Sequence, residues 1–105
     1  MYTIGKKIKE NATENCMNIY ELEFSNHAFE QLSKMDKSVS RVIVSWLSQN
    51  IDHTKNPRKH GKGLSNDNLD LWRYCVSDYR ILVQIEDEKK VVYAVTIIHV
   101  RDLYR

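Results

Sequence analysis

The chain has 105 residues and a formal net charge of +2 at pH 7, which fits one domain with a single core. The small net charge excludes a strongly basic protein that binds nucleic acid through overall charge alone. No apolar run is long enough to cross a membrane. The two cysteines lack the spacing of a metal or redox site, so a reduced, cytoplasmic protein is expected.

The first part of the chain is polar and has no periodic pattern. It also lacks the apolar segment of a secretory signal. We therefore expect residues 1–17 to form a loose N-terminal extension and residues 18–105 to form the folded domain. Translation from an upstream start codon is the alternative explanation of the first part of the chain. That domain opens with a half-buried strand, because apolar and charged residues alternate from Asn18 to Phe24.

Two amphipathic helices are predicted next, with Ser25 and Asp36 as their N-caps. Their apolar positions recur at helical spacing and are Ala28, Phe29, Leu32 and Met35 in the first helix and Val39, Val42, Ile43, Trp46 and Leu47 in the second. The break between the two segments is short, which predicts a helical hairpin.

Residues 52–69 have no periodicity, and loops of this length in a small domain are often functional. The stretch between His53 and Asn66 contains no acidic residue but includes Lys55, Arg58, Lys59, His60 and Lys62. Such a local cluster is typical of contacts to phosphate, so these five residues are candidate RNA-binding residues. A solvated loop that happens to be basic is the alternative.

A β-hairpin follows, with strands at 71–76 and 79–86 joined by the two-residue turn Ser77-Asp78. The turn predicts the register: Cys75 lies opposite Arg80, and Arg73 lies opposite Leu82. The apolar run 91–99 predicts a further, central strand. The fold class is thus α+β: an N-terminal strand, a helical hairpin and a three-stranded antiparallel meander. The helices should cover the face of Trp72, Tyr74 and Ile81.

The opposite face would then present Arg73 and Arg80, near His99, Arg101 and Tyr104 of the tail. RNA cleavage without a metal needs a base for the ribose 2′-hydroxyl, cations for the charge on phosphorus, and an acid for the leaving oxygen. The arginines could hold the phosphate, His99 could move a proton, and Tyr104 could stack on a base. Solvated arginines and a structural histidine are the alternatives. No metal signature or cofactor motif is present.

The run LWRYCVSDYRILVQIEDEKKVVYAV, followed by HVRDLYR, resembles the RelE/ParE superfamily of type II toxin–antitoxin toxins, and its RelE branch most closely. The segments LSKMDKSVSRVIVSWL and NPRKHGKGL match in the same order. The resemblance covers about residues 18 to 105. It implies two helices on an antiparallel sheet, a cognate antitoxin that masks the active face, and metal-independent cleavage of mRNA on the ribosome.

Carried over by position, the resemblance makes Arg73 and Arg80 basic site residues, Tyr104 the terminal tyrosine, and His99 a residue of the same site. Operator DNA would be contacted only through the antitoxin. Two positions depart from the family pattern, because Cys75 and Val100 stand where relatives usually carry a basic residue. The activity is therefore expected to be reduced. A ParE-like inhibitor of DNA gyrase and a degenerate toxin that only binds its antitoxin are the alternative functions.

Overall fold

The computed structural model describes residues 18–64 and 70–103. The expected extension, residues 1–17, and Tyr104 lie outside these ranges. In chain order the elements are β1 (Glu21–Phe24), α3 (Asn26–Lys34), α4 (Lys37–Asn50), the short 3-10 helix η2 (Pro57–Lys59), β2 (Lys62–Gly63), β3 (Leu71–Val76), β4 (Tyr79–Glu86), β5 (Val91–His99) and α5 (Val100–Leu103). The α+β architecture predicted from the sequence is confirmed.

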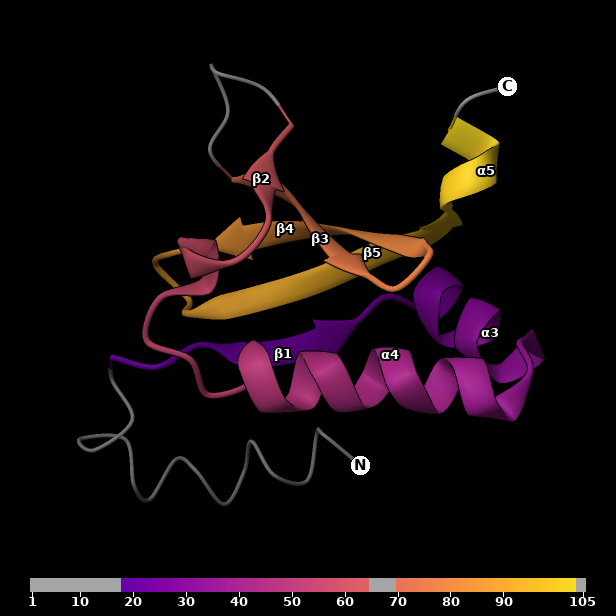
Figure 1. Ribbon diagram of the computed structural model, residues 1–105. Coiled ribbons are helices and arrows are strands. Elements are labelled where there is room, and N and C mark those ends of the chain that lie inside the picture. The colour runs from indigo at the N-terminus through magenta and orange to yellow at the C-terminus, as the bar shows by residue number, and fades with distance from the viewer. Residues whose placement is uncertain (1–17, 65–69, 104–105) are drawn as a thin grey trace.

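The strands form one sheet in the order β1-β5-β4-β3-β2, with α3 and α4 together on one face (Figure 1). The predicted meander is β3, β4 and β5, which pair antiparallel, and β5 is an interior strand as expected. Two additions extend the meander on either side. β1 pairs parallel with β5, and the two-residue β2 pairs antiparallel with β3.

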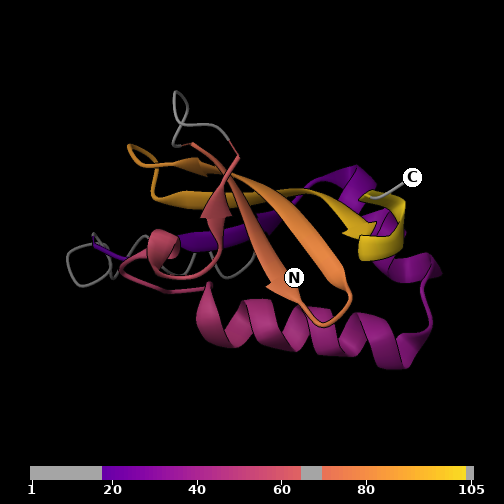
Figure 2. The same ribbon diagram turned by 45° about the horizontal axis from the view of Figure 1, so that its top comes forward.

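The core lies between the helices and the sheet, and its inward strand residues alternate as a half-covered sheet requires. Tyr74 and Val76 of β3 and Ile81, Val83 and Ile85 of β4 are buried. On the helices, Ala28, Leu32, Ile43 and Leu47 are buried. The turn of the β3–β4 hairpin reaches toward α4 (Figure 2), so α4 covers the face of Tyr74 and Ile81, as predicted.

Two helical positions predicted to face the core do not. The side chains of Phe29 and Val42 are 65% and 53% exposed. Phe29 follows the fully buried Ala28, and Val42 precedes the fully buried Ile43. Successive side chains on a helix point about 100° apart. The inward stripe is therefore narrower than the apolar pattern suggests.

The two predicted N-caps behave differently. Ser25 is the N-cap of α3, and its Oγ accepts a hydrogen bond from the Ala28 N–H at 2.9 Å. Asp36 occupies the N-cap position of α4 but makes no capping bond to the backbone. Its Oδ2 instead accepts a hydrogen bond from the Ser38 Oγ at 3.3 Å. The start of α4 is confirmed, although the expected capping bond is absent.

A β-bulge at Val95 changes the side-chain alternation of β5. Val83 pairs with Ala94, whereas the preceding Leu82 pairs with Thr96, which leaves Val95 as the extra residue. The bulge is held from outside the strand, because the Ser25 Oγ donates to the Val95 carbonyl at 2.7 Å. Beyond the bulge, even-numbered residues of β5 face away from the helices, and odd-numbered residues face them.

Beyond the end of β1, the backbone hydrogen-bonding groups at the edge of β5 are paired with a side chain instead of a strand. The Gln31 Nε2 of α3 donates to the Ile97 carbonyl at 2.8 Å, and the Gln31 Oε1 accepts from the Ile97 N–H at 2.8 Å. The amide thus makes both backbone bonds that a neighbouring strand would make. This contact holds the register of the C-terminal end of β5, next to the tail.

Candidate functional site: the open face of the sheet and its basic loop

The open face of the sheet, opposite α3 and α4, carries the two strand arginines. Cys75 pairs with Arg80, and Arg73 pairs with Leu82, which confirms the predicted register. Arg73 and Arg80 therefore share one face, and none of the hairpin residues on that face is buried. This part of the face is therefore at least partly accessible to solvent.

The two guanidinium groups differ in their surroundings. The Arg80 Nη1 donates to the carbonyl oxygens of Ser77 and Tyr79, at 3.3 and 3.1 Å, so this guanidinium turns back toward the hairpin turn. Arg73 is half-buried, and its Nε is buried without a hydrogen-bond partner within the described part of the chain. The two arginines thus differ in their contacts, and the exposed Cys75 is the next residue of β3 after Arg73 on the same face.

His99 does not belong to this face, which corrects its expected placement. It pairs with Tyr79, and the two rings meet edge to face with centroids 4.9 Å apart. Val39 and Ile43 of α4 line a pocket together with Tyr79 and His99, which places His99 on the helix side. The bulge at Val95 is the reason, because without it the alternation would turn His99 to the open face.

The tail begins with α5, directly after His99. The backbone N–H of Arg101 donates to the His99 Nδ1 at 3.1 Å, and the Val100 N–H donates to the Asp78 carbonyl at 2.7 Å. The Arg101 side chain is exposed, whereas Val100 is half-buried. His99 therefore supports the first turn of the tail, and Arg101 remains available for a ligand.

The basic loop, residues 54–63, lies against the sheet. Three of its predicted RNA-binding side chains, Lys55, Lys59 and Lys62, are exposed. Lys62 lies in β2 directly opposite Arg73, so these two cations share the open face. The sequence has no signal for this pairing, because a two-residue strand has no periodicity to detect.

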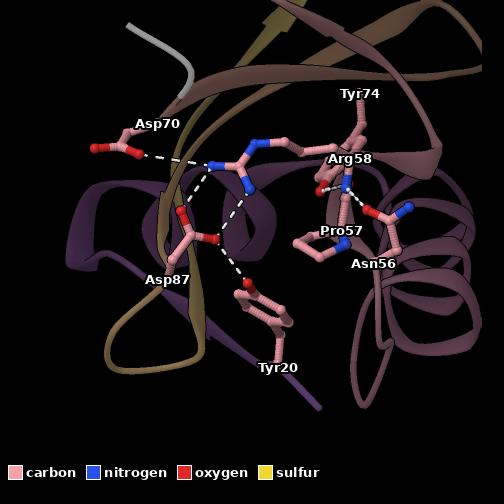
Figure 3. Close-up of polar contacts among 7 residues, drawn as sticks. All are labelled: Tyr20, Asn56, Pro57, Arg58, Asp70, Tyr74 and Asp87. Atoms are coloured by element: carbon pink, nitrogen blue, oxygen red, sulfur yellow. Dashed lines mark hydrogen bonds and ion pairs between the residues drawn. The ribbon is translucent and has the colours of Figure 1, made fainter. Parts of the chain in front are cut away.

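Arg58 is engaged in ion pairs, unlike the three lysines. Its Nη1 and Nη2 donate to Oδ1 and Oδ2 of Asp87, at 2.9 and 3.1 Å (Figure 3). The Asp70 Oδ1 lies 3.6 Å from the Arg58 Nη2. The bond to Asp87 raises the pKa of Arg58 and lowers the pKa of the Asp87 carboxyl. The structure therefore gives this predicted RNA-binding residue a role within the protein.

His60 is half-buried, and its position is also internal to the protein. Its ring contacts Trp46 of α4 edge to face, with centroids 5.4 Å apart. Its carbonyl accepts a hydrogen bond from the Trp72 Nε1 at 2.6 Å. These contacts fix the loop against α4 and the hairpin, so an RNA-binding role for the His60 ring has no support from its position.

The described residues contain neither a membrane-spanning helix nor a candidate metal site. None of their helices is long and apolar enough to span a bilayer. No three His, Cys, Asp or Glu side chains gather as a possible metal site within residues 18–64 and 70–103. The cationic open face with its basic loop is the feature that needs a functional explanation.

The sequence matches the family of ParE toxins of type II toxin–antitoxin systems, parDE, over residues 22–104. The chain belongs to this family. The expected membership of the RelE/ParE superfamily is thereby confirmed, and the protein is a toxin of a type II toxin–antitoxin system. No curated protein matches the sequence.

Solved toxin structures share the fold of this toxin. The toxin–antitoxin complex RelBE2 of Mycobacterium tuberculosis has a chain with a TM-score of 0.67 and 23% identity, covering 79% of this chain and 93% of that one. The isolated RelE toxin of E. coli gives a TM-score of 0.60 at 22% identity, with coverage of 76% and 83%. The archaeal RelE–RelB complex of Pyrococcus horikoshii OT3 gives 0.61 at 18%, with coverage of 77% and 94%.

Proposed function

We propose that this toxin is an endoribonuclease that cleaves mRNA on the ribosome. The observation that carries the proposal is the placement of Arg73, Arg80 and Lys62 on one open face of the sheet. Guanidinium groups bind phosphate oxygens through paired N–H donors, which suits a phosphodiester held for cleavage. The likeness to toxins named RelE supports this choice within the superfamily.

The proposed reaction needs no metal. The ribose 2′-oxygen attacks the adjacent phosphorus, the bond from phosphorus to the 5′-oxygen breaks, and a cyclic phosphate and a 5′-hydroxyl form. The 2′-hydroxyl loses a proton, and the leaving 5′-oxygen gains one. Arg73 and Arg80 would stabilise the negative charge that grows on the non-bridging oxygens.

The tail would complete the site. Arg101 is exposed beside the hairpin end of the sheet and would add a third cation to the phosphate. We keep Tyr104 as the residue that stacks on a base or donates a hydrogen bond. His99 would position the tail by accepting a hydrogen bond at Nδ1 from the Arg101 N–H, and it would not take the 2′-hydroxyl proton.

The proposed partners follow from this activity. A cognate antitoxin would cover the open face, as suggested by the RelBE complexes among the solved relatives. The ribosome and its mRNA would be the substrate, operator DNA would be reached only through the antitoxin, and the site of action would be the cytoplasm. Cys75 and Val100 would lower the rate, because the family usually places cations there.

Cleavage of a reporter mRNA in a purified translation system tests the proposal. Wild-type toxin should cut translated mRNA and leave naked RNA almost intact, and Arg73→Ala should slow cleavage by about a hundredfold. Arg41→Ala, an exposed arginine of α4 on the helix side, is the matched control and should cleave at the wild-type rate. Arrest of translation with intact transcripts would contradict the proposal.

Inhibition of DNA gyrase is the second candidate, because the matching family is described as the ParE toxins. The position of His99 on the helix side also removes one group expected of a nuclease site. A supercoiling assay separates the two functions: inhibition of gyrase with translation intact would favour this candidate. Antitoxin binding without either effect would favour a degenerate toxin.

A further inference from the structure

The basic loop is anchored to the sheet by three contacts, two from β3 and one from the turn between β4 and β5. The Tyr74 hydroxyl of β3 donates to the Pro57 carbonyl at 2.6 Å, and the Trp72 Nε1 donates to the His60 carbonyl at 2.6 Å. The third anchor is the ion pair of Arg58 with Asp87, a residue of the turn between β4 and β5. Of these three anchors only the third depends on charge, and the Asp70 Oδ1 lies 3.6 Å from the Nη2 of the same guanidinium.

Asp87 is held more firmly than a single surface ion pair would be. Both of its carboxylate oxygens accept from the Arg58 guanidinium, and its Oδ1 also accepts from the Tyr20 hydroxyl at 2.6 Å (Figure 3). A bidentate pair with a further hydrogen bond fixes both the position and the orientation of a guanidinium. The Arg58 guanidinium also lies over the Trp72 ring, 5.9 Å from its centroid.

The position of Lys62 depends on these anchors. β2 contains only Lys62 and Gly63, and so short a strand is marginal by itself. It nevertheless pairs with Trp72 and Arg73 of β3. The anchors immediately before it, at Pro57, Arg58 and His60, bring the chain to the edge of β3 and hold it there.

We propose that Asp87 is a positioning residue for RNA: through Arg58 it holds the basic loop so that Lys62 stands opposite Arg73 on one phosphate path. This inference rests on the proposed function. It assigns an acidic side chain of the β4–β5 turn to the binding of a polyanion. Arg58 serves inside the protein, and the exposed lysines contact the phosphates.

The proposal predicts an effect opposite in sign to that of simple electrostatics. Neutralising an acidic group raises the net charge by one, which by itself strengthens binding to a polyanion. Asp87→Asn should instead weaken binding, because the loop loses its charged anchor. Glu88→Gln is the matched control, since Glu88 is an exposed acid of the same turn; it should leave binding unchanged or slightly stronger.

The decisive measurement is the kinetics of mRNA cleavage against the concentration of programmed ribosomes. Asp87→Asn should raise KM about three- to tenfold, with kcat within about twofold of the wild type, as expected when a binding anchor is lost. A KM equal to or below that of Glu88→Gln would overturn the proposal. A fall in the kcat of Asp87→Asn with an unchanged KM would also overturn the proposal.

A charge exchange separates positioning from direct contact. Arg58→Asp alone should raise KM, and the double variant Arg58→Asp, Asp87→Arg restores an ion pair at unchanged net charge. Partial recovery of KM in the double variant supports a positioning role. A KM no better than that of Arg58→Asp would show that Arg58 itself touches RNA, which overturns the proposal.

Hydrogen exchange distinguishes a failure of this inference from a failure of the proposed function. The Leu64 N–H donates to the Leu71 carbonyl at 3.1 Å just beyond β2, and it should exchange faster in Asp87→Asn than in Glu88→Gln. Unchanged exchange overturns the positioning role, whatever the toxin cleaves. Faster exchange in Asp87→Asn, combined with no mRNA cleavage by the wild type, would show that Asp87 anchors the loop. It would overturn the role of Asp87 in RNA binding and also the proposed function.

Discussion

Cys75 lies directly opposite Arg80 in the β3–β4 hairpin, on the face of the sheet that α3 and α4 leave open. The thiol is exposed, so no packing constraint explains a small residue at this position. The next residue of β3 on the same face is Arg73, so Cys75 has an arginine beside it on its own strand and another opposite it on β4. A single substitution at position 75 can therefore test the chemistry of the proposed site with little effect on the stability of the fold.

Cys75→Arg should raise the rate of mRNA cleavage about tenfold or more, because it adds a charge-stabilising donor beside Arg73 and Arg80. The exposed site can hold the longer side chain, and repulsion from Arg80 should cost only a few tenths of a kcal/mol. Cleavage in the translation system is the measurement, with Cys75→Ser as the uncharged control. Equal rates for the two variants would contradict the proposed gap in the site.

Val100→Arg should also raise cleavage and toxicity. Val100 is the first residue of α5 and is half-buried, so an arginine there can reach the surface with its aliphatic part still packed. Growth after induction and cleavage of reporter mRNA are the two measurements, and Val100→Met is the neutral control. Unchanged toxicity in both Val100→Arg and Cys75→Arg would show that neither departure weakens the toxin.

Gly61→Ala should destabilise the protein by about 2 kcal/mol or more. Gly61 has a φ of 78°, and a Cβ there would lie 2.1 Å from the Arg73 carbonyl oxygen, so the strain of a left-handed alanine adds to a clash with backbone. Urea unfolding measures the loss, with Ser45→Ala on the exposed side of α4 as control. A loss below about 0.5 kcal/mol would mean that the loop shifts freely.

Tyr74→Phe should lower the free energy of unfolding at pH 7 by about 1 kcal/mol, because it leaves the buried Pro57 carbonyl without its donor. Burial raises the pKa of Tyr74 above its ordinary value of 10.0. The folded wild type therefore keeps a proton that the unfolded chain loses, and wild-type stability falls as the pH rises beyond about 10.

The difference between the wild type and Tyr74→Phe should accordingly shrink between pH 10 and pH 12, since only the wild type carries this ionisation. Unfolding curves across this range provide the test. Tyr93→Phe, at a half-buried position on the open face, should change the stability at pH 7 by less than about 0.5 kcal/mol. A difference that grows with pH would be inconsistent with a buried, protonated Tyr74.

The sequence by itself determined the two long helices, the N-terminal strand, the three strands of the meander and the hairpin register, but not the short elements η2, β2 and α5. Apolar periodicity and turn chemistry act over a few residues, so the two-residue turn at Ser77-Asp78 was enough to place Cys75 opposite Arg80 and Arg73 on the same face. Helix N-termini were readable for the same reason. Family-specific runs of residues added the toxin assignment, which the family match over residues 22–104 confirmed.

Only the tertiary structure decided which side chains meet. The bulge at Val95 is held by Ser25, a residue 70 positions away in the chain, and it turns His99 from the open face to the helix side. Arg58 forms an ion pair with Asp87, 29 positions away, so the lysines are the exposed cations of the loop. Contacts between distant segments leave no local periodic signal, so which of the candidate side chains lie together could be seen only in the folded chain.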